Sequence, residues 1–317
     1  MVGEVKKLAD RISSEISKVV VGQQEAVTFL LVGLLAKGHV LMEGVPGLAK
    51  TLLAKTLAYI LNAEFTRIQF TPDLMPADIL GTNIYDLQSR SFNLRKGPIF
   101  TEILLGDEIN RAPPKTQSAL LEAMEERQVS IDGKTLPLSE NFMVVATQNP
   151  IEQEGTYPLP EAQLDRFLMK VLLNYPSQVE EREILGKYGK SVEVHDLENM
   201  GLARLSGESG IGRFRQRAEQ VTVEEGIVSY VQSLLDGTRR SPHLHLGASP
   251  RGGIGLLRTS KVLAAMRGRD FITPDDIKDM AYPVLRHRVI LRPEAELEGL
   301  TPDRVISQIL DGIPVPR

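Results

Sequence analysis

The chain has 317 residues, of which 42% are hydrophobic and 25% charged, and its formal net charge is −4. These values are typical of a globular protein with room for two domains, and the slight negative charge gives no overall field that attracts nucleic acid. The chain contains no cysteine, which excludes disulfide scaffolds and thiolate metal sites and fits a reducing compartment.

The first forty residues predict two helices. Leu8, Ile12, Ile16 and Val19 recur on one helical face. The apolar run 27–36 has only about half the length that spans a bilayer, so we interpret it as a buried helix. The N-terminal stretch also lacks the apolar centre of a signal peptide. We therefore expect a cytoplasmic protein without membrane insertion.

Strand-length apolar segments alternate with helical patterns up to about residue 175. This alternation predicts a five-stranded parallel sheet of the α/β class, with a helix at 51–60 after the first strand. The predicted strands are 39–43, 64–70, 103–107, 142–148 and 167–173.

Two segments interrupt this alternation and predict β-hairpin inserts. Segment 82–94 has a polar turn between apolar residues, and 128–138 alternates on both sides of Asp132-Gly133, a strong turn signal. From 176 onward the pattern becomes helical, with a polar, glycine-rich loop expected at 196–212. We therefore predict an α/β core at 1–175 and a smaller all-α domain with a C-terminal tail at 176–317.

The expected helices of this second part are 222–236, 250–267 and 274–285. Ser249-Pro250 and Thr273-Pro274 each place a capping residue before a proline at the first helical position.

The segment GVPGLAKT, residues 44–51, lies between the first predicted strand and its helix. It resembles the phosphate-binding pattern G-x-x-x-x-G-K-[ST], except that Ala49 replaces the last glycine. Backbone N–H groups at a helix start attract phosphate, while Lys50 would reach the β- and γ-phosphates and Thr51 would bind Mg²⁺. Alanine is tolerated at 49 if that residue already has helical dihedrals, and we expect the phosphate site to survive the replacement.

Polar residues follow two other predicted strands. Asp107-Glu108 ends an apolar strand, where the first acid can hold a metal shell and the second can polarise water. Asn149 ends another and could position that water. The alternative for Asp107-Glu108 is an acidic pair that only caps a helix. The alternative for Asn149 is an asparagine that only forms a turn.

Two arginines complete the set. Arg166 immediately precedes the last predicted strand, a position that suits a functional arginine. Its alternative, purely structural role is a surface ion pair with Asp165 or Glu161. Arg251 lies in the first turn of a capped helix, where a cation opposes the helix dipole, which favours a functional role.

The order of these motifs resembles the AAA+ ATPases and, in detail, the MoxR family. The resemblance covers nearly the whole chain. It is carried by GVPGLAKT, DEINRAPPKTQSALLEAMEERQV (107–129), ATQNP, EGTYPLPEAQLDRF (154–167) and HRVILRP (287–293).

The resemblance implies a nucleotide site, with ATP and Mg²⁺ as its ligands. Asp107 would be the Walker B metal-shell acid, Glu108 the catalytic base and Asn149 sensor 1. Arg251 would be sensor 2. Arg166 would be an arginine finger for the neighbouring subunit, with Arg111 as a rival. The nucleotide-contacting residues would be Val20, Val21, Gly22, Gly44, Val45, Pro46, Gly47, Leu48, Ala49, Lys50, Thr51 and Leu52, with Thr51 and Asp107 at the metal.

The resemblance further implies hexameric rings, partners that carry von Willebrand factor A domains, and chaperone-like remodelling. Four other functions stay open. They are a nucleic-acid motor, a magnesium-chelatase-like subunit, a small-molecule kinase and a nucleotide-binding module without turnover. Residues 201–270 hold eleven Lys/Arg against six Asp/Glu, which allows a basic face. No DNA-binding module is appended, so we do not expect nucleic acid as substrate.

Overall fold

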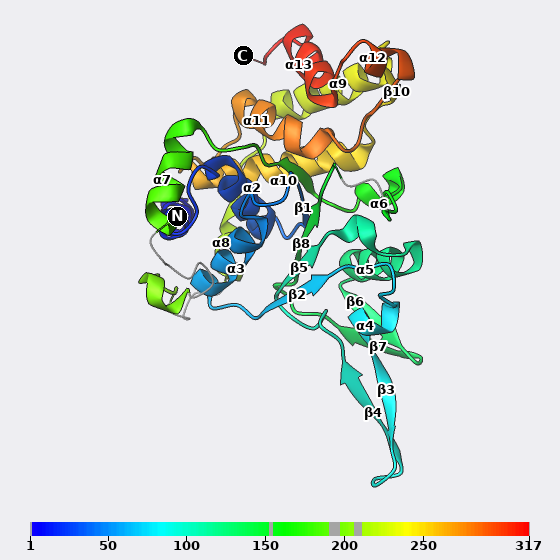
Figure 1. The fold of residues 1–317 in the computed structure, drawn as a ribbon. Coiled ribbons are helices and arrows are strands. Elements are labelled where there is room, and N and C mark those ends of the chain that lie inside the picture. Colours follow the sequence, from blue (N-terminus) through cyan, green and yellow to red (C-terminus); the bar gives the residue numbers. More distant parts are fainter. Residues whose placement is uncertain (1, 152–154, 190–196, 206–210, 317) are drawn as a thin grey trace.

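A five-stranded parallel sheet forms the centre of the molecule, in a computed structural model that describes residues 2–151, 155–189, 197–205 and 211–316 (Figure 1). The order of its strands is β2-β5-β8-β1-β9. All neighbours are parallel, so the carboxyl ends of the strands lie along one edge and the amino ends along the other. The strands are β1 (Val40–Glu43), β2 (Phe65–Gln69), β5 (Ile103–Asp107), β8 (Met143–Gln148) and β9 (Met169–Leu172).

Both faces of the sheet are buried along β5, β8 and β1, which explains why these strands are continuous apolar runs, whereas the edge strand β2 mixes apolar and polar residues. Successive side chains point to opposite faces. Val40 and Met42 therefore belong to one core cluster, while Leu41 belongs to the other. The predicted sheet is confirmed.

Helices cover the two faces of the sheet. On one side lies α2, which is apolar after its first turn apart from Thr28, and α1 packs against both α2 and α3. Ile12, Ile16 and Val19 are buried and Leu8 is partly buried, as the predicted stripe requires. On the other side α5 packs against α4. These helices are α1 (Gly3–Ser17), α2 (Gln24–Leu35), α3 (Lys50–Leu61), α4 (Pro76–Leu80) and α5 (Pro114–Glu126).

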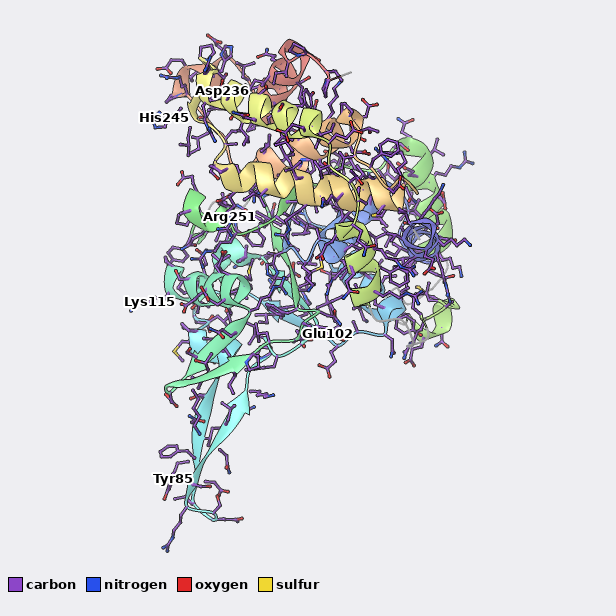
Figure 2. All side chains as sticks on the ribbon, turned by 180° about the vertical axis from the view of Figure 1, so that it is seen from behind. Tyr85, Glu102, Lys115, Asp236, His245 and Arg251 are labelled. Atoms are coloured by element: carbon purple, nitrogen blue, oxygen red, sulfur yellow. The ribbon has the colours of Figure 1, made fainter. Side chains whose placement is uncertain are left out.

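The two predicted hairpins are confirmed. They are β3 (Gly81–Asp86) with β4 (Ser91–Lys96), and β6 (Gln128–Ile131) with β7 (Lys134–Pro137). The longer one, β3–β4, extends from the end of the molecule opposite the C-terminal helices (Figure 1), and Tyr85 lies in its distal half (Figure 2). Its Asn83 donates a 2.7 Å hydrogen bond to Asp132 in the turn of the shorter hairpin.

The C-terminal part is mainly helical, as predicted, and α10 packs against α1, α2 and α8 as well as against α9 and α11. One short antiparallel strand pair, β10 with β11, lies among these helices and was not part of the prediction. The elements after β9 are α7 (Gln178–Tyr188), η2 (Glu198–Met200), α8 (Ile211–Glu219), α9 (Glu225–Arg240), β10 (Leu244–Leu246), α10 (Pro250–Met266), α11 (Pro274–Leu285), β11 (Ile290–Leu291), α12 (Pro293–Leu297) and α13 (Pro302–Gly312).

The loop predicted at 196–212 lies partly outside the described residues; its described part contains η2 and the start of α8. Glu154 of the motif at 154–167 also lies outside them. Two short helical segments remain, η1 (Ile109–Arg111) and α6 (Glu161–Leu164). Within the part of the chain that the structure describes, no helix combines the length and apolarity needed to cross a bilayer.

Candidate functional site

The segment 44–49 forms a loop between the end of β1 and the start of α3. Gly47 has φ +87°, a left-handed conformation that favours glycine. The Lys50 ammonium donates a 2.5 Å hydrogen bond to the Gly44 carbonyl across the loop. The loop therefore has the strand–loop–helix context that phosphate binding requires.

Ala49 does not have the helical dihedrals under which alanine would be tolerated without strain. Its dihedrals are φ +59° and ψ +21°, which is left-handed rather than right-handed, and it is the residue just before α3. The chain must turn sharply here so that the Ala49 carbonyl can accept the first helical hydrogen bond, from Leu53, at 2.8 Å. The methyl group therefore occupies a conformation that costs an L-residue about 1–2 kcal/mol.

Asp107 lies at the carboxyl end of β5, beside the loop. Its Oδ2 accepts a hydrogen bond from the Thr51 hydroxyl at 3.3 Å, and its Oδ1 accepts one from the Thr147 hydroxyl at 2.5 Å. A carboxylate and a hydroxyl are hard oxygen donors of the kind that Mg²⁺ prefers. Thr51 and Asp107 therefore fit a magnesium site.

Glu108 follows directly in a left-handed conformation, with φ +58°. Its backbone N–H donates to the Thr147 hydroxyl at 2.9 Å. Its carboxylate accepts hydrogen bonds from the Gln69 amide at 2.8 Å and from Arg111 at 3.2 Å. Arg111 is thus held on the same chain's Glu108 at the carboxyl edge of the sheet.

A cavity of about 520 Å³ joins the phosphate loop to these strand ends. Asn149, only 4% exposed, lines it after β8, and its Oδ1 accepts the Ile151 N–H at 3.2 Å. The remaining lining residues from the loop, α3 and the strand ends are Pro46, Gly47, Ala49, Lys50, Thr51, Leu52, Lys55, Asp107, Glu108 and Thr147. The structure therefore gathers the predicted lysine, both acids and the asparagine around one cavity.

The far end of this cavity is apolar. Val20 and Val21 line it as predicted, together with Val19, Ile184 and Tyr188. Tyr188 of α7 donates its hydroxyl to the Val19 carbonyl, and partial burial raises the pKa of this phenol above its usual value.

Four of the predicted nucleotide contacts do not line the cavity: Gly22, Gly44, Val45 and Leu48. A side chain at Gly44 would meet the Leu173 carbonyl at 2.9 Å, so this glycine permits the close packing of two strand ends. Leu48 is 7% exposed and belongs to the core.

Arg166 and Arg251 line a different cavity, of about 260 Å³. Arg166 precedes β9 and therefore lies at the amino edge of the sheet, as do Lys37 and His39 before β1. Arg251 reaches it from the start of α10, close to α5 (Figure 2). The structure thus places these two arginines together and away from the phosphate loop.

The alternative for Arg166, an ion pair with Asp165 or Glu161, is absent among the described residues. Asp165 instead pairs with Arg288 at 2.6 Å and with Arg251 at 3.8 Å. Arg251 also donates to Glu125 at 2.5 Å.

The second cavity carries a large excess of positive charge. It is lined by six Lys or Arg side chains but only two acids, Glu125 and Asp165. Arg127 is anchored on the Lys37 carbonyl at 2.5 Å, and burial together with the nearby Arg258 lowers the pKa of Arg127. An anion that entered this cavity would relieve the repulsion between these cations.

Four contributors to the first site were not identified from the sequence: Arg67, Gln69, Thr147 and Tyr188. Thr147 lies within the ATQNP motif, so its position next to Asn149 was the available signal. Arg67 and Gln69 share one face of β2, and Gln69 stands directly opposite Asp107 in the sheet. Their contribution depends on strand order, which the sequence does not encode locally.

Comparison with known proteins agrees with this arrangement. Residues 39–169 match the family model "ATPase family associated with various cellular activities (AAA)", and 236–309 match the "AAA lid domain". The chain is 45% identical to the uncharacterized protein YeaC of Bacillus subtilis, over 99% of this chain and 96% of that protein. It is 44% identical to Chaperone MoxR1 of Mycobacterium tuberculosis, over 97% of this chain and 82% of that protein. The crystal structure of a candidate ATPase from Cytophaga hutchinsonii superimposes with a TM-score of 0.91 at 41% identity, covering 100% of this chain and 97% of that one.

Proposed function

Because the chain belongs to the MoxR family of AAA+ ATPases, we propose that it hydrolyses ATP to ADP and phosphate at the 520 Å³ cavity. One observation carries this proposal: β1, β5 and β8 are neighbours, and their carboxyl ends bring Lys50, Asp107 and Asn149 to the same cavity. The apolar end beside Val20 and Tyr188 is suited to a flat base, and the loop is suited to phosphates.

Each residue has a role that its position supports. Lys50, already placed across the loop, contacts the β- and γ-phosphates. Glu108 orients and deprotonates the attacking water, and Asn149 positions it. Thr51 and Asp107 would hold Mg²⁺, which would supply positive charge to the phosphate oxygens. Gln69 and Arg111 hold the Glu108 carboxylate by hydrogen bonds before substrate binds.

Assembly into a ring is the second part of the proposal. Arg166 and Arg251 lie at the amino edge of the sheet or beside it, apart from their own chain's phosphate loop. Sensor 2 and the arginine finger therefore act, in this proposal, on the nucleotide of the neighbouring subunit in a hexameric ring. The excess positive charge of their cavity is suited to receiving a triphosphate. The contact of Arg111 with its own chain's Glu108 makes Arg111 the weaker candidate for the finger.

The work driven by hydrolysis is, in our proposal, chaperone-like remodelling of a partner protein, with von Willebrand factor A domain proteins as the expected class. The β3–β4 hairpin supports a protein partner, because it exposes Leu87 by 82% and Phe92 by 71%. Tyr85, also exposed, packs edge-to-face on Phe92, and exposed apolar side chains that cluster in this way mark interaction sites. A cytoplasmic location stays a prediction.

A nucleic-acid motor is not favoured by the basic excess at 201–270. Each of its eleven cationic side chains contacts a carboxylate or a backbone carbonyl of the same chain. For example, Arg213 and Arg217 both pair with Glu4. These contacts hold the cations within the fold, and two of them, Arg251 and Arg258, line the 260 Å³ cavity assigned above to the neighbouring subunit's nucleotide.

The experiment that tests the proposal is the ATPase rate per subunit, measured with Mg²⁺ over a range of protein concentrations. We expect the rate to rise as subunits assemble, because each site needs arginines from a neighbour. A measurable rate that stays flat with concentration would contradict the shared site and favour a self-sufficient, kinase-like enzyme. No turnover at any concentration would reduce the protein to a nucleotide-binding module.

A further inference from the structure

We propose that Arg67 is a positioning residue that occupies Asp107 in the nucleotide-free chain and leaves it when the magnesium–nucleotide complex binds. This inference rests on the proposed function, because it takes Asp107 to be the metal-shell acid. Arg67 lies on the edge strand β2, and two of its nitrogens donate to Asp107 Oδ2, Nη2 at 2.7 Å and Nε at 3.1 Å.

The first argument is a count of donors around Asp107. An ionised carboxylate offers about four lone-pair sites. In this structure Asp107 receives four donors: two from Arg67, one from Thr51 and one from Thr147. Three of these donors point to Oδ2 and only Thr147 points to Oδ1, so Oδ2, the oxygen beside Thr51, is fully occupied, and a metal that also contacts Thr51 can engage that oxygen only if one donor departs.

The second argument identifies the donor that departs. Thr147 is 1% exposed and is fixed between Asp107 and the Glu108 N–H, so it has no room to move. Thr51 is itself a predicted metal ligand and must stay. The side chain of Arg67 is 48% exposed and lies on the outermost strand, so its guanidinium can turn to water without a large desolvation cost.

The third argument is electrostatic. Without metal, Arg67 neutralises a carboxylate that would otherwise repel the incoming phosphates across a short distance. With metal bound, a guanidinium beside the same oxygen would repel Mg²⁺. Arg67 therefore has opposite effects on nucleotide binding in the two conditions: it strengthens binding without Mg²⁺ and weakens binding with Mg²⁺.

The test is the dissociation constant of ATPγS, measured by calorimetry with Mg²⁺ and again with EDTA, for the wild type and for Arg67→Gln. We expect Arg67→Gln to bind ATPγS roughly twofold to fivefold more tightly than the wild type with Mg²⁺, and more weakly by a similar factor in EDTA. The factor is small because the ion pair that the substitution removes is half exposed to solvent. Arg67→Lys, which keeps the charge, should stay near the wild type in both conditions. Arg240→Gln is the matched control, since it removes an exposed arginine from a surface pair with Asp236.

Two outcomes overturn the inference. Weaker binding by Arg67→Gln in both conditions would mean that Arg67 only supports the fold of the site, and unchanged binding in both would mean that it does not influence the metal at all. Failure of the proposed function has a different result, because the wild type would then bind ATPγS no better with Mg²⁺ than with EDTA and Asp107→Asn would behave like the wild type.

Discussion

The left-handed alanine before α3 gives a prediction with an unusual sign. Replacing alanine by glycine inside a helix normally destabilises a protein by about 0.5–1 kcal/mol, because glycine loses more backbone freedom on folding. At Ala49 the same entropic loss is opposed by relief of about 1–2 kcal/mol of left-handed strain, since φ is +59°. We therefore expect Ala49→Gly to stabilise the nucleotide-free protein by roughly 0–1.5 kcal/mol.

The assay is urea unfolding of the two proteins under one set of conditions, with the difference taken between variants. Ala162→Gly is the matched control: it lies in α6, is exposed, and has no left-handed strain to relieve, so it should destabilise. If Ala49→Gly lowers the stability as much as Ala162→Gly does, residue 49 is not left-handed and the account of this loop is wrong.

Three further results are expected. Glu108→Gln should bind ATP and hydrolyse it roughly 10²–10⁴ times more slowly, and unchanged turnover in a steady-state ATPase assay would remove Glu108 from the mechanism. Arg166→Ala should slow hydrolysis with little loss of ATP affinity, whereas an equal loss of both would contradict a finger that acts from the neighbouring subunit. Burial lowers the pKa of His39 from 6.5 to about 3, so the unfolded chain binds a proton there that the folded chain does not. Stability should therefore fall by up to roughly 1.4 kcal/mol per pH unit as the pH drops from about 6.5 towards 3. Buried His287, whose pKa burial also lowers, adds to this slope, so His39→Gln should reduce the slope without abolishing it in urea titrations at several pH values.

The sequence predicted the elements whose information is local. Strands buried on both faces appear as continuous apolar runs, and the Asp132-Gly133 turn has the positive dihedrals, φ +47° and +78°, that its residues favour. The strand pair β10–β11 was missed because its strands are only two and three residues long and lie more than forty residues apart, so neither carries a periodic signal.

The candidate site was predictable where a motif and a strand end coincide, as at Lys50 and Asp107. It was not predictable where one side chain reaches across the sheet. Arg67 contacts Asp107 only because β2 pairs with β5, and Tyr188 closes the cavity only because α7 folds back onto Val19. The left-handed dihedrals of Ala49 could not be predicted because residue type alone does not reveal where the first helical turn begins.

Sheet geometry connects the two cavities to the proposed assembly. Asp107 ends a strand and Lys50 and Asn149 come after strands, whereas Arg166 precedes one, so a parallel sheet sends it to the opposite edge. A strand of four residues, such as β9, is roughly 13 Å long at about 3.3 Å per residue. That separation, with a packed core between, keeps Arg166 from its own chain's phosphates. In the proposed ring, an arginine at this edge would meet the phosphates presented at a neighbouring subunit's carboxyl edge, so the proposal ties dependence on assembly to the position of Arg166 before rather than after its strand.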